Sequence, residues 1–140
     1  MKLDEYDHKI ISALRENARL SVREIAKKLK MRHSTVHLRI QKLIRDKIIE
    51  KFTIKLNNKA IGENFIVFVF IAADKIIPDN AFKDGHIKEV FGITGEYDLL
   101  MKCKFAGIED FNDFILNFRK RYDLKKTLTM IATVNVKEEL

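Results

Sequence analysis

The sequence has a single cysteine and no apolar run long enough to cross a membrane. Cys103 has no partner for an internal disulfide, and its alternating neighbours indicate a small buried side chain. The longest apolar run covers residues 65–73, whereas a membrane helix needs roughly 20 apolar residues. The first residues also lack the apolar core of a secretion signal. We therefore expect a cytoplasmic protein that contacts no membrane.

Positive charge is distributed unevenly along the chain. Residues 1–60 hold 16 Lys and Arg against 7 Asp and Glu, a net charge of +9. Residues 61–140 hold 11 against 13, a net charge of −2. This asymmetry predicts two units with different partners, and the basic unit suits a polyanion. The alternative is a lysine-rich surface that only keeps the protein soluble.

Two short helices are predicted at the start of the basic half. Asp4 is placed to cap a first helix that ends near Asn17, with apolar residues recurring at helical spacing. Ser21 and Glu24 have the spacing of a capping box at the start of a second helix. A turn at residues 30–32 then leads to the next helical pattern.

A third helix is predicted over residues 33–46, followed by an extended strand or wing over residues 47–56. We expect its inward side chains to be Val36, Ile40, Leu43 and Ile44. Two helices joined by a three-residue turn, the second with a basic outer face, are typical of a helix-turn-helix. Such a helix fits the major groove of DNA and reaches base edges with its N-terminal residues.

The predicted DNA contacts lie on and just before this third helix. Its hydroxyl and imidazole groups can bond to bases or phosphates, whereas the later cations supply salt-dependent affinity. The predicted DNA-binding residues are Arg32, His33, Ser34, Thr35, His37, Leu38, Arg39, Lys42 and Arg45. Arg39 has a second possible role, since it could instead tie this helix to a carboxylate of the first helix. A plain helical bundle with a solvated basic face is the alternative. His33 and His37 are four residues apart, a spacing also used by zinc ligands, but without a third ligand nearby we expect no metal site.

The second half predicts a β-α-β-β-α-β order, the ferredoxin-like arrangement. The apolar run at residues 65–73 reads as a strand with two apolar faces, which needs two covers. Helices of the same chain can supply one cover, so we expect a partner subunit to supply the other. A helix beginning near Pro78, a second helix at residues 108–122 and a last strand at residues 125–136 complete the pattern.

The stretch GITGEYD, residues 92–98, lies between two predicted strands. A phosphate cradle needs a helix after its glycines, and here a strand follows. An acid catalyst at Asp98 lacks a nucleophile or a metal set nearby, so we expect neither an enzyme nor a cofactor. A hairpin turn fits best, with Gly95 at positive φ and Gly92 permitting close approach.

The first half resembles the DNA-binding domain of the Lrp/AsnC, or feast/famine, family of transcriptional regulators. The residues that match its opening motif are Leu3, Asp4, Asp7, Ile10, Ile11, Leu14, Asn17, Ala18 and Arg19, and those that match its third helix are Thr35, Val36, Arg39, Ile40 and Leu43. Three positions depart from the pattern, because Lys30 and Lys47 replace glycines and Arg32 replaces a serine. The two lysines must then adopt backbone angles that glycine adopts more easily, or the turns must use a slightly different geometry.

The resemblance covers essentially the whole chain and implies what the second half does. The family motif GxxGxYD is matched by Gly92, Gly95, Tyr97 and Asp98. In the family this loop lies between dimers and lines an amino-acid site. The predicted effector-binding residues are Gly92, Thr94, Gly95, Tyr97 and Asp98. Further candidate contacts lie on the last strand, at Thr127, Thr129 and Ile131.

The resulting fold class is α+β, with an N-terminal winged helix-turn-helix and a C-terminal ferredoxin-like domain. We expect a DNA-binding domain at 1–52, a linker or strand at 53–63, and an effector-binding and oligomerisation domain at 64–140. The predicted function is a sequence-specific regulator of transcription that binds palindromic double-stranded DNA as dimers, and as octamers, and responds to an amino acid. The alternatives are an architectural DNA-coating protein and a small-molecule-binding module without DNA binding.

Overall fold

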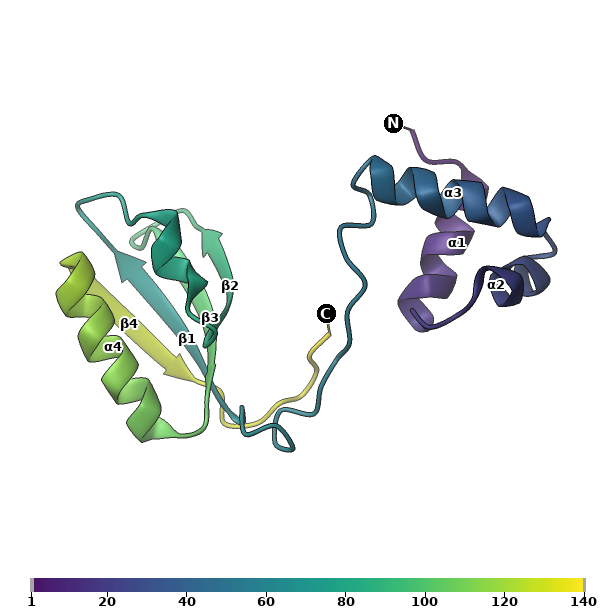
Figure 1. Cartoon of the computed structure of the whole chain (residues 1–140). Helices are drawn as coiled ribbons and strands as arrows, with labels where there is room; N and C mark the ends of the chain where they lie inside the picture. The colour runs from purple at the N-terminus through teal and green to yellow at the C-terminus, as the bar shows by residue number, and fades with distance from the viewer. Residues whose placement is uncertain (1, 140) are drawn as a thin grey trace. The chain divides into compact units, whose positions relative to one another are not determined.

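The computed structural model describes residues 2–139, which fold into two compact units (Figure 1). The first unit runs through Ile54 and the second begins at Lys55. The division falls inside the stretch predicted to link two domains. No helix among residues 2–139 is long and apolar enough to span a membrane.

The first unit consists of α1 (Glu5–Glu16), α2 (Val22–Leu29) and α3 (His33–Arg45). Both predicted capping boxes form. The Asp7 N–H donates to Asp4 over 2.9 Å, and the Glu24 N–H donates to the Ser21 hydroxyl over 3.1 Å. Asn17 ends α1, as predicted. These caps satisfy backbone donors that would otherwise lack a partner at the start of each helix.

The core of the first unit is formed by one apolar side of each helix. Its buried residues are Ile10, Leu14, Ile25, Ala26, Val36, Ile40 and Leu43. Ile44 was predicted to point inward but is 39% exposed, so that prediction is wrong. Leu43 on the same turn is fully buried, but the next residue of a helix points about 100° further round its axis, and this turns Ile44 toward solvent.

The strand or wing predicted over residues 47–56 is absent. The chain turns after α3 and then runs through residues 50–57 without strand pairing among the described residues. Its apolar side chains Phe52, Ile54 and Leu56 are exposed. A strand needs a neighbour for its backbone hydrogen bonds, and this chain offers none there.

The second unit is a four-stranded antiparallel sheet of β1 (Phe65–Ala72), β2 (Ile87–Gly92), β3 (Leu99–Phe105) and β4 (Lys126–Ile131). The strand order is β2-β3-β1-β4. The short 3-10 helix η1 (Asp79–Lys83) and the helix α4 (Ile108–Tyr122) complete it. The predicted β-α-β-β-α-β order is therefore confirmed.

Two predicted boundaries in this unit are wrong. The helix expected after Pro78 is only the five-residue η1, and residues 87–90 belong to β2 instead. Pairing of Val90 with Met101 outweighs the local helical pattern. The last strand ends at Ile131, not at residue 136, and one further bond from the Ala132 N–H to Ile66, over 3.0 Å, follows it along β1.

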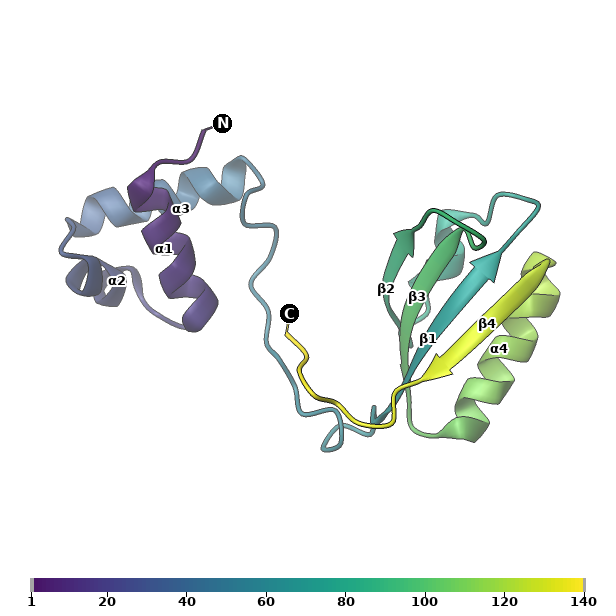
Figure 2. The same ribbon diagram turned by 180° about the vertical axis from the view of Figure 1, so that it is seen from behind.

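Helices cover one face of the sheet. In Figure 1 both α4 and η1 lie in front of the strands, and in Figure 2, seen from behind, the strands lie in front. Val67, Val69 and Ile71 of β1 are fully buried on the covered face. Cys103 is buried beside them, and burial raises the pKa of its thiol to about 12. The prediction of a small buried cysteine is confirmed.

The other face of the sheet, here called the open face, carries an apolar row near the β2–β3 turn and the charged Lys102 and Lys104 farther along β3. The register aligns Phe91, Leu100, Phe70 and Leu128 in a row across all four strands. Phe91 is 53% exposed, and Met130 in the next row is 52% exposed. The second cover that β1 was predicted to need is thus not supplied by the helices of this chain.

Candidate functional site

The outer side of α3 presents polar and cationic side chains. Six of the predicted DNA-binding residues on α3 are exposed, and Thr35 is half-buried. The exposed ones are His33, Ser34, His37, Leu38, Lys42 and Arg45. The helical spacing places these residues opposite the buried side of α3, so they form one continuous surface. This surface is called the recognition face below.

The two lysines that replace glycines before and after α3 adopt the left-handed backbone that glycine adopts more easily, as predicted. Lys30 ends α2 in the left-handed region at φ 54°, and Lys47 after α3 has φ 57°. Arg32 precedes α3, and no described side chain caps this helix start. The open backbone N–H groups of the first turn and the exposed Arg32 together suit a phosphate group.

Arg39 lies against α1 rather than standing out from the recognition face. Its guanidinium donates to Asp4 over 2.7 Å and to Asp7 over 2.9 Å, and it stacks 5.3 Å from the Tyr6 ring. The hydrogen bond from Arg39 holds the pKa of Asp4 below its usual value. Asp7 is buried, and the guanidinium of Arg39 is its charged partner. Arg39 therefore fixes α3 on α1, and a DNA contact by Arg39 stays a prediction.

Residues 92–98 form the turn of the β2–β3 hairpin, as predicted. The Ile93 N–H donates to the Asp98 carbonyl over 2.9 Å, which closes the turn. Gly95 has φ 107°, a conformation that side-chain-bearing residues rarely adopt. Gly92 was expected to permit a close approach, but no described atom lies within 4 Å of where its Cβ would be. Within this chain that expectation is wrong.

Asp98 connects the turn to the end of β1. Its backbone N–H donates to Ile71 over 2.8 Å, and its carboxylate accepts from the Ala73 N–H over 3.0 Å. The carboxylate is nevertheless exposed. The same group can therefore hold the turn in place and present negative charge to a ligand.

Tyr97 and Lys126 join the turn to the start of β4. The Tyr97 ring packs 5.7 Å from Phe70, and the Lys126 ammonium lies 4.9 Å above the Tyr97 ring. Lys126 also pairs with Glu96, which raises the pKa of Lys126 and lowers that of Glu96. We call residues 92–98 with Lys126 the effector loop.

Sequence reasoning missed Lys126. Strand order, which brings the start of β4 beside the end of β1, is what places it there. The sequence instead predicts effector contacts farther along β4, at Thr127, Thr129 and Ile131. These residues pair with Ile71, Val69 and Val67 of β1, so their side chains lie on the helix-covered face. A role for these three residues in binding an effector stays a prediction.

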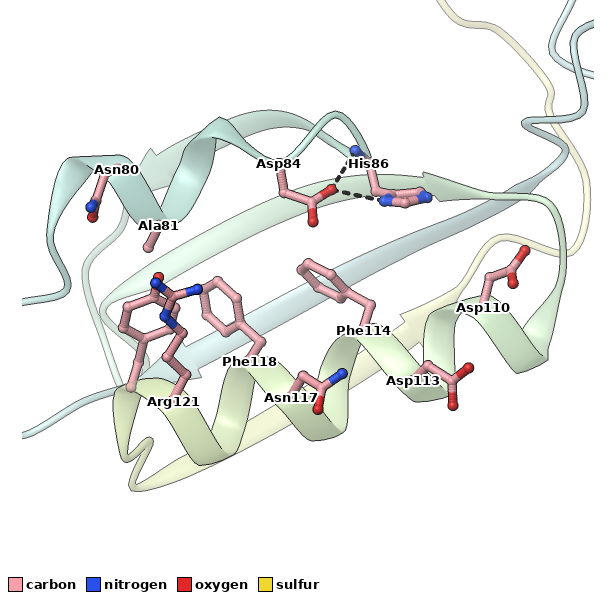
Figure 3. A pocket seen from close by; sticks show the side chains of 11 residues that line it. Asn80, Ala81, Asp84, His86, Asp110, Asp113, Phe114, Asn117, Phe118 and Arg121 are labelled. Carbon is pink, nitrogen blue, oxygen red and sulfur yellow. Dashed lines mark hydrogen bonds and ion pairs between the residues drawn. The ribbon is translucent and has the colours of Figure 1, made fainter.

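A separate pocket of about 480 Å³ lies between η1 and α4 (Figure 3). Phe114 and Phe118 point from α4 toward η1, and the Asp84 carboxylate accepts from the His86 ring over 2.7 Å. Burial raises the pKa of Asp84, but the His86 backbone and ring bonds outweigh it and leave the pKa low. None of the predicted effector residues lines this pocket. In the part of the chain that the structure describes, no group of three His, Cys, Asp or Glu could hold a metal.

Comparison with known proteins identifies the family of this chain. The model of the AsnC-type helix-turn-helix domain matches residues 3–44, and that of the Lrp/AsnC ligand binding domain matches residues 85–140. An uncharacterized HTH-type transcriptional regulator of Pyrococcus furiosus is 38% identical over 99% of this chain and 97% of its own length. The chain belongs to the Lrp/AsnC family of transcriptional regulators.

Solved Lrp/AsnC structures share this fold. A transcriptional regulator from Neisseria meningitidis, solved as a complex with L-methionine, superposes with a TM-score of 0.88 at 21% identity and covers 98% of this chain and 94% of that one. A feast or famine regulatory protein from Mycobacterium tuberculosis, also complexed with L-methionine, gives 0.89 at 19% identity, with 99% and 97% covered. The resemblance stated from sequence is confirmed, and the chain is a transcriptional regulator with a ligand-binding domain.

The recognition face and the effector loop fall on the two matched domains of this Lrp/AsnC regulator. All the predicted DNA-binding residues except Arg45 lie within 3–44, and all the predicted effector residues lie within 85–140. The domain bounds and the roles of single residues stay predictions.

Proposed function

We propose that this Lrp/AsnC regulator binds palindromic double-stranded DNA sequence-specifically through the recognition face. The observation that carries the proposal is the isolation of one polar, cationic surface on α3, with its buried side locked by Arg39. A rigid helix with exposed hydroxyl, imidazole and ammonium groups can bond both base edges and phosphates. We propose a regulatory and not a catalytic role, which the description of the relatives as transcriptional regulators supports.

The proposed dimer forms through the open face. Its apolar row crosses all four strands, and a second copy can cover it with the same residues about a twofold axis. A symmetric dimer presents two copies of α3 to two half-sites, which makes the binding site palindromic. Association of dimers into octamers is part of the proposal, and the effector loop is the contact we assign to it.

We further propose that an amino acid binds at the effector loop and changes how dimers associate. The loop presents the carboxylate of Asp98 and the paired charges of Glu96 and Lys126, while Gly95 leaves its backbone open. An amino acid carries both an ammonium and a carboxylate, so charges of both signs suit it. The L-methionine complexes of two structural neighbours support this class of ligand.

Light scattering with and without each common amino acid tests the effector. One amino acid should change the mass or the melting temperature of the protein. Asp98→Asn should remove the response, because the negative charge is lost. The amide oxygen can still accept from the Ala73 N–H, so the turn should keep its place. Asp74→Asn changes an exposed carboxylate outside the loop and should leave the response intact. A mass indifferent to every amino acid would make the loop an assembly turn only.

Competition with random DNA separates this proposal from an architectural coating role. A sequence-specific regulator should lose about 1–3 kcal/mol of binding free energy for each altered base pair of its half-site. A coating protein should bind altered and unaltered duplexes alike at moderate salt. Equal binding would therefore favour the coating role and remove sequence-specific regulation.

A further inference from the structure

The recognition face contains one side chain that its polar neighbours do not explain. Leu38 is 67% exposed, although Val36, the other apolar residue in the first half of α3, is fully buried. It makes no part of the core that holds α1, α2 and α3 together. Packing of the first unit therefore gives no reason for a leucine at this position.

The surroundings of Leu38 are cationic and hydrogen-bonding. It lies in a shallow hollow with Thr35 one turn before it, Lys42 one turn after it, and Lys2 at the rim. Two carboxylates also line this hollow, but Arg39 pairs with both of them. An apolar group framed by ammonium groups fits a polyanion that exposes an apolar atom between its phosphates.

The major groove of DNA offers such an atom. Among the base edges exposed there, the C5 methyl of thymine is the apolar group, while the other positions are hydrogen-bond donors or acceptors. Leu38 stands in the second turn of α3, within the N-terminal half that a recognition helix directs at base edges. A protein partner fits less well, because one leucine among charges offers far less apolar area than a stable interface needs.

We infer that Leu38 packs against a thymine methyl group in the major groove, so that each half-site carries a thymine opposite the second turn of α3. The inference rests on the proposed sequence-specific DNA binding and names what that binding recognises. It also assigns different tasks to neighbouring residues. Leu38 discriminates the base, Lys42 holds a phosphate, and Arg39 positions the helix.

Replacement of thymine by deoxyuridine tests this directly. Deoxyuridine pairs with adenine in the same way and lacks only the methyl group. A duplex selected from random sequence by the full-length protein would carry the replacement at each half-site thymine in turn. Replacement at one of these thymines should weaken binding about fourfold, as expected for the loss of one buried methyl group. Replacement of that thymine in both half-sites should weaken binding about fifteenfold.

Leu38→Ala completes the cycle. The variant should bind the thymine duplex more weakly than the wild type and should no longer distinguish thymine from deoxyuridine at the sensitive position. Leu116→Ala removes another exposed leucine, on α4, and should keep full discrimination. Unchanged melting temperatures for both variants show that the fold is preserved, since neither side chain is buried.

Each other outcome overturns a defined part of the argument. Specific binding without any response to deoxyuridine, or a selected half-site without thymine, overturns the inference and leaves the proposed function standing. A response that persists in Leu38→Ala means that another group contacts the methyl, which also overturns it. No sequence preference in the selection overturns the proposed function and the inference together.

Discussion

Arg39 shows how the position of one side chain changes its expected role. Sequence placed it among the DNA contacts, with a tie to the first helix as the second possibility, and the structure shows that tie to Asp4 and Asp7. We predict that Arg39→Ala lowers the free energy of unfolding of the first unit by about 2 kcal/mol, because it leaves the buried Asp7 carboxylate unpaired. Chemical denaturation of the full chain measures this.

Arg45→Ala is the matched control for that experiment. Arg45 is on the same helix, and its pair with Asp46 is largely exposed to solvent. Its loss should change stability by less than about 0.5 kcal/mol. Equal losses for both variants would show that the Arg39 pair has no special structural role.

Cys103 supports a second prediction at this scale. Burial raises the pKa of its thiol to about 12, so almost no thiolate exists near neutral pH. A thiol reagent at pH 8 should react with the folded protein at least about 100-fold more slowly than with the protein in denaturant. Rapid reaction of the folded protein would mean that the covered face of the sheet opens readily.

At the scale of elements, the helix ends carry avoidable strain. Lys30 ends α2 with φ 54°, where a side chain costs energy that glycine avoids. We predict that Lys30→Gly raises the free energy of unfolding by about 1 kcal/mol, a shift of a few degrees in melting temperature. Lys27→Gly, at an exposed helical position in the last turn of α2, should lower it by up to about 1 kcal/mol. The opposite result would refute the strain argument.

Most elements were predictable because their signals are local. Each of these signals is formed by residues close together in the sequence. They are the capping boxes at Asp4 and Ser21, the helical spacing of α3 and the apolar run of β1. The short η1 was not predictable, because β2 takes over where the local pattern still favours a helix. The strand expected after α3 failed for the opposite reason, since its pattern is extended but no neighbour lies beside it.

The candidate site was predictable to the extent that it is contiguous. The turn at residues 92–98 and the outer side of α3 could be assigned from their own residues. The contact of Lys126 with Tyr97 depends on strand order, and the pairing of Arg39 depends on how α3 packs on α1. Such contacts join residues far apart in the chain, so no local pattern indicates them.

At the scale of the whole molecule, the C-terminal tail is tied to the sheet and to the linker. Glu138 accepts from Lys104 over 3.1 Å and from Asn58 over 2.9 Å, and it also pairs with Lys102. The bond from Lys102 lowers the pKa of Glu138 to about 2, against 4.5 for an ordinary glutamate. The carboxylate is therefore held more strongly when charged than when protonated.

The stability contributed by Glu138 should depend on pH. A lowered folded-state pKa gives a contribution that is complete above about pH 4.5 and is lost as the pH falls toward 2. Glu138→Gln should cost on the order of 2 kcal/mol at pH 7 and nearly nothing at pH 2, measured by denaturation across this range. Glu139→Gln, whose carboxylate is exposed, should cost nothing at either pH. A cost for Glu138→Gln that does not change with pH would rule out this linkage.

Self-association through the open face gives a further prediction. Phe91→Lys places a charge in the apolar row, where a second copy would have to bury it. Dimerisation should weaken by roughly 100-fold, about 3 kcal/mol, in sedimentation or light scattering. Leu116→Lys on the opposite side of the unit should leave the mass unchanged. A wild-type mass for Phe91→Lys would move the dimer contact to another surface.

The chain between α3 and β1 contains neither helix nor strand over residues 46–64. In a dimer, this tether makes capture of the second half-site an intramolecular event, at an effective concentration on the order of millimolar. Each recognition face then needs only modest affinity of its own, because avidity supplies the remainder. Every phosphate contact made by one α3 also enters the binding equilibrium twice, so the dimer should release DNA over a narrow interval of salt concentration.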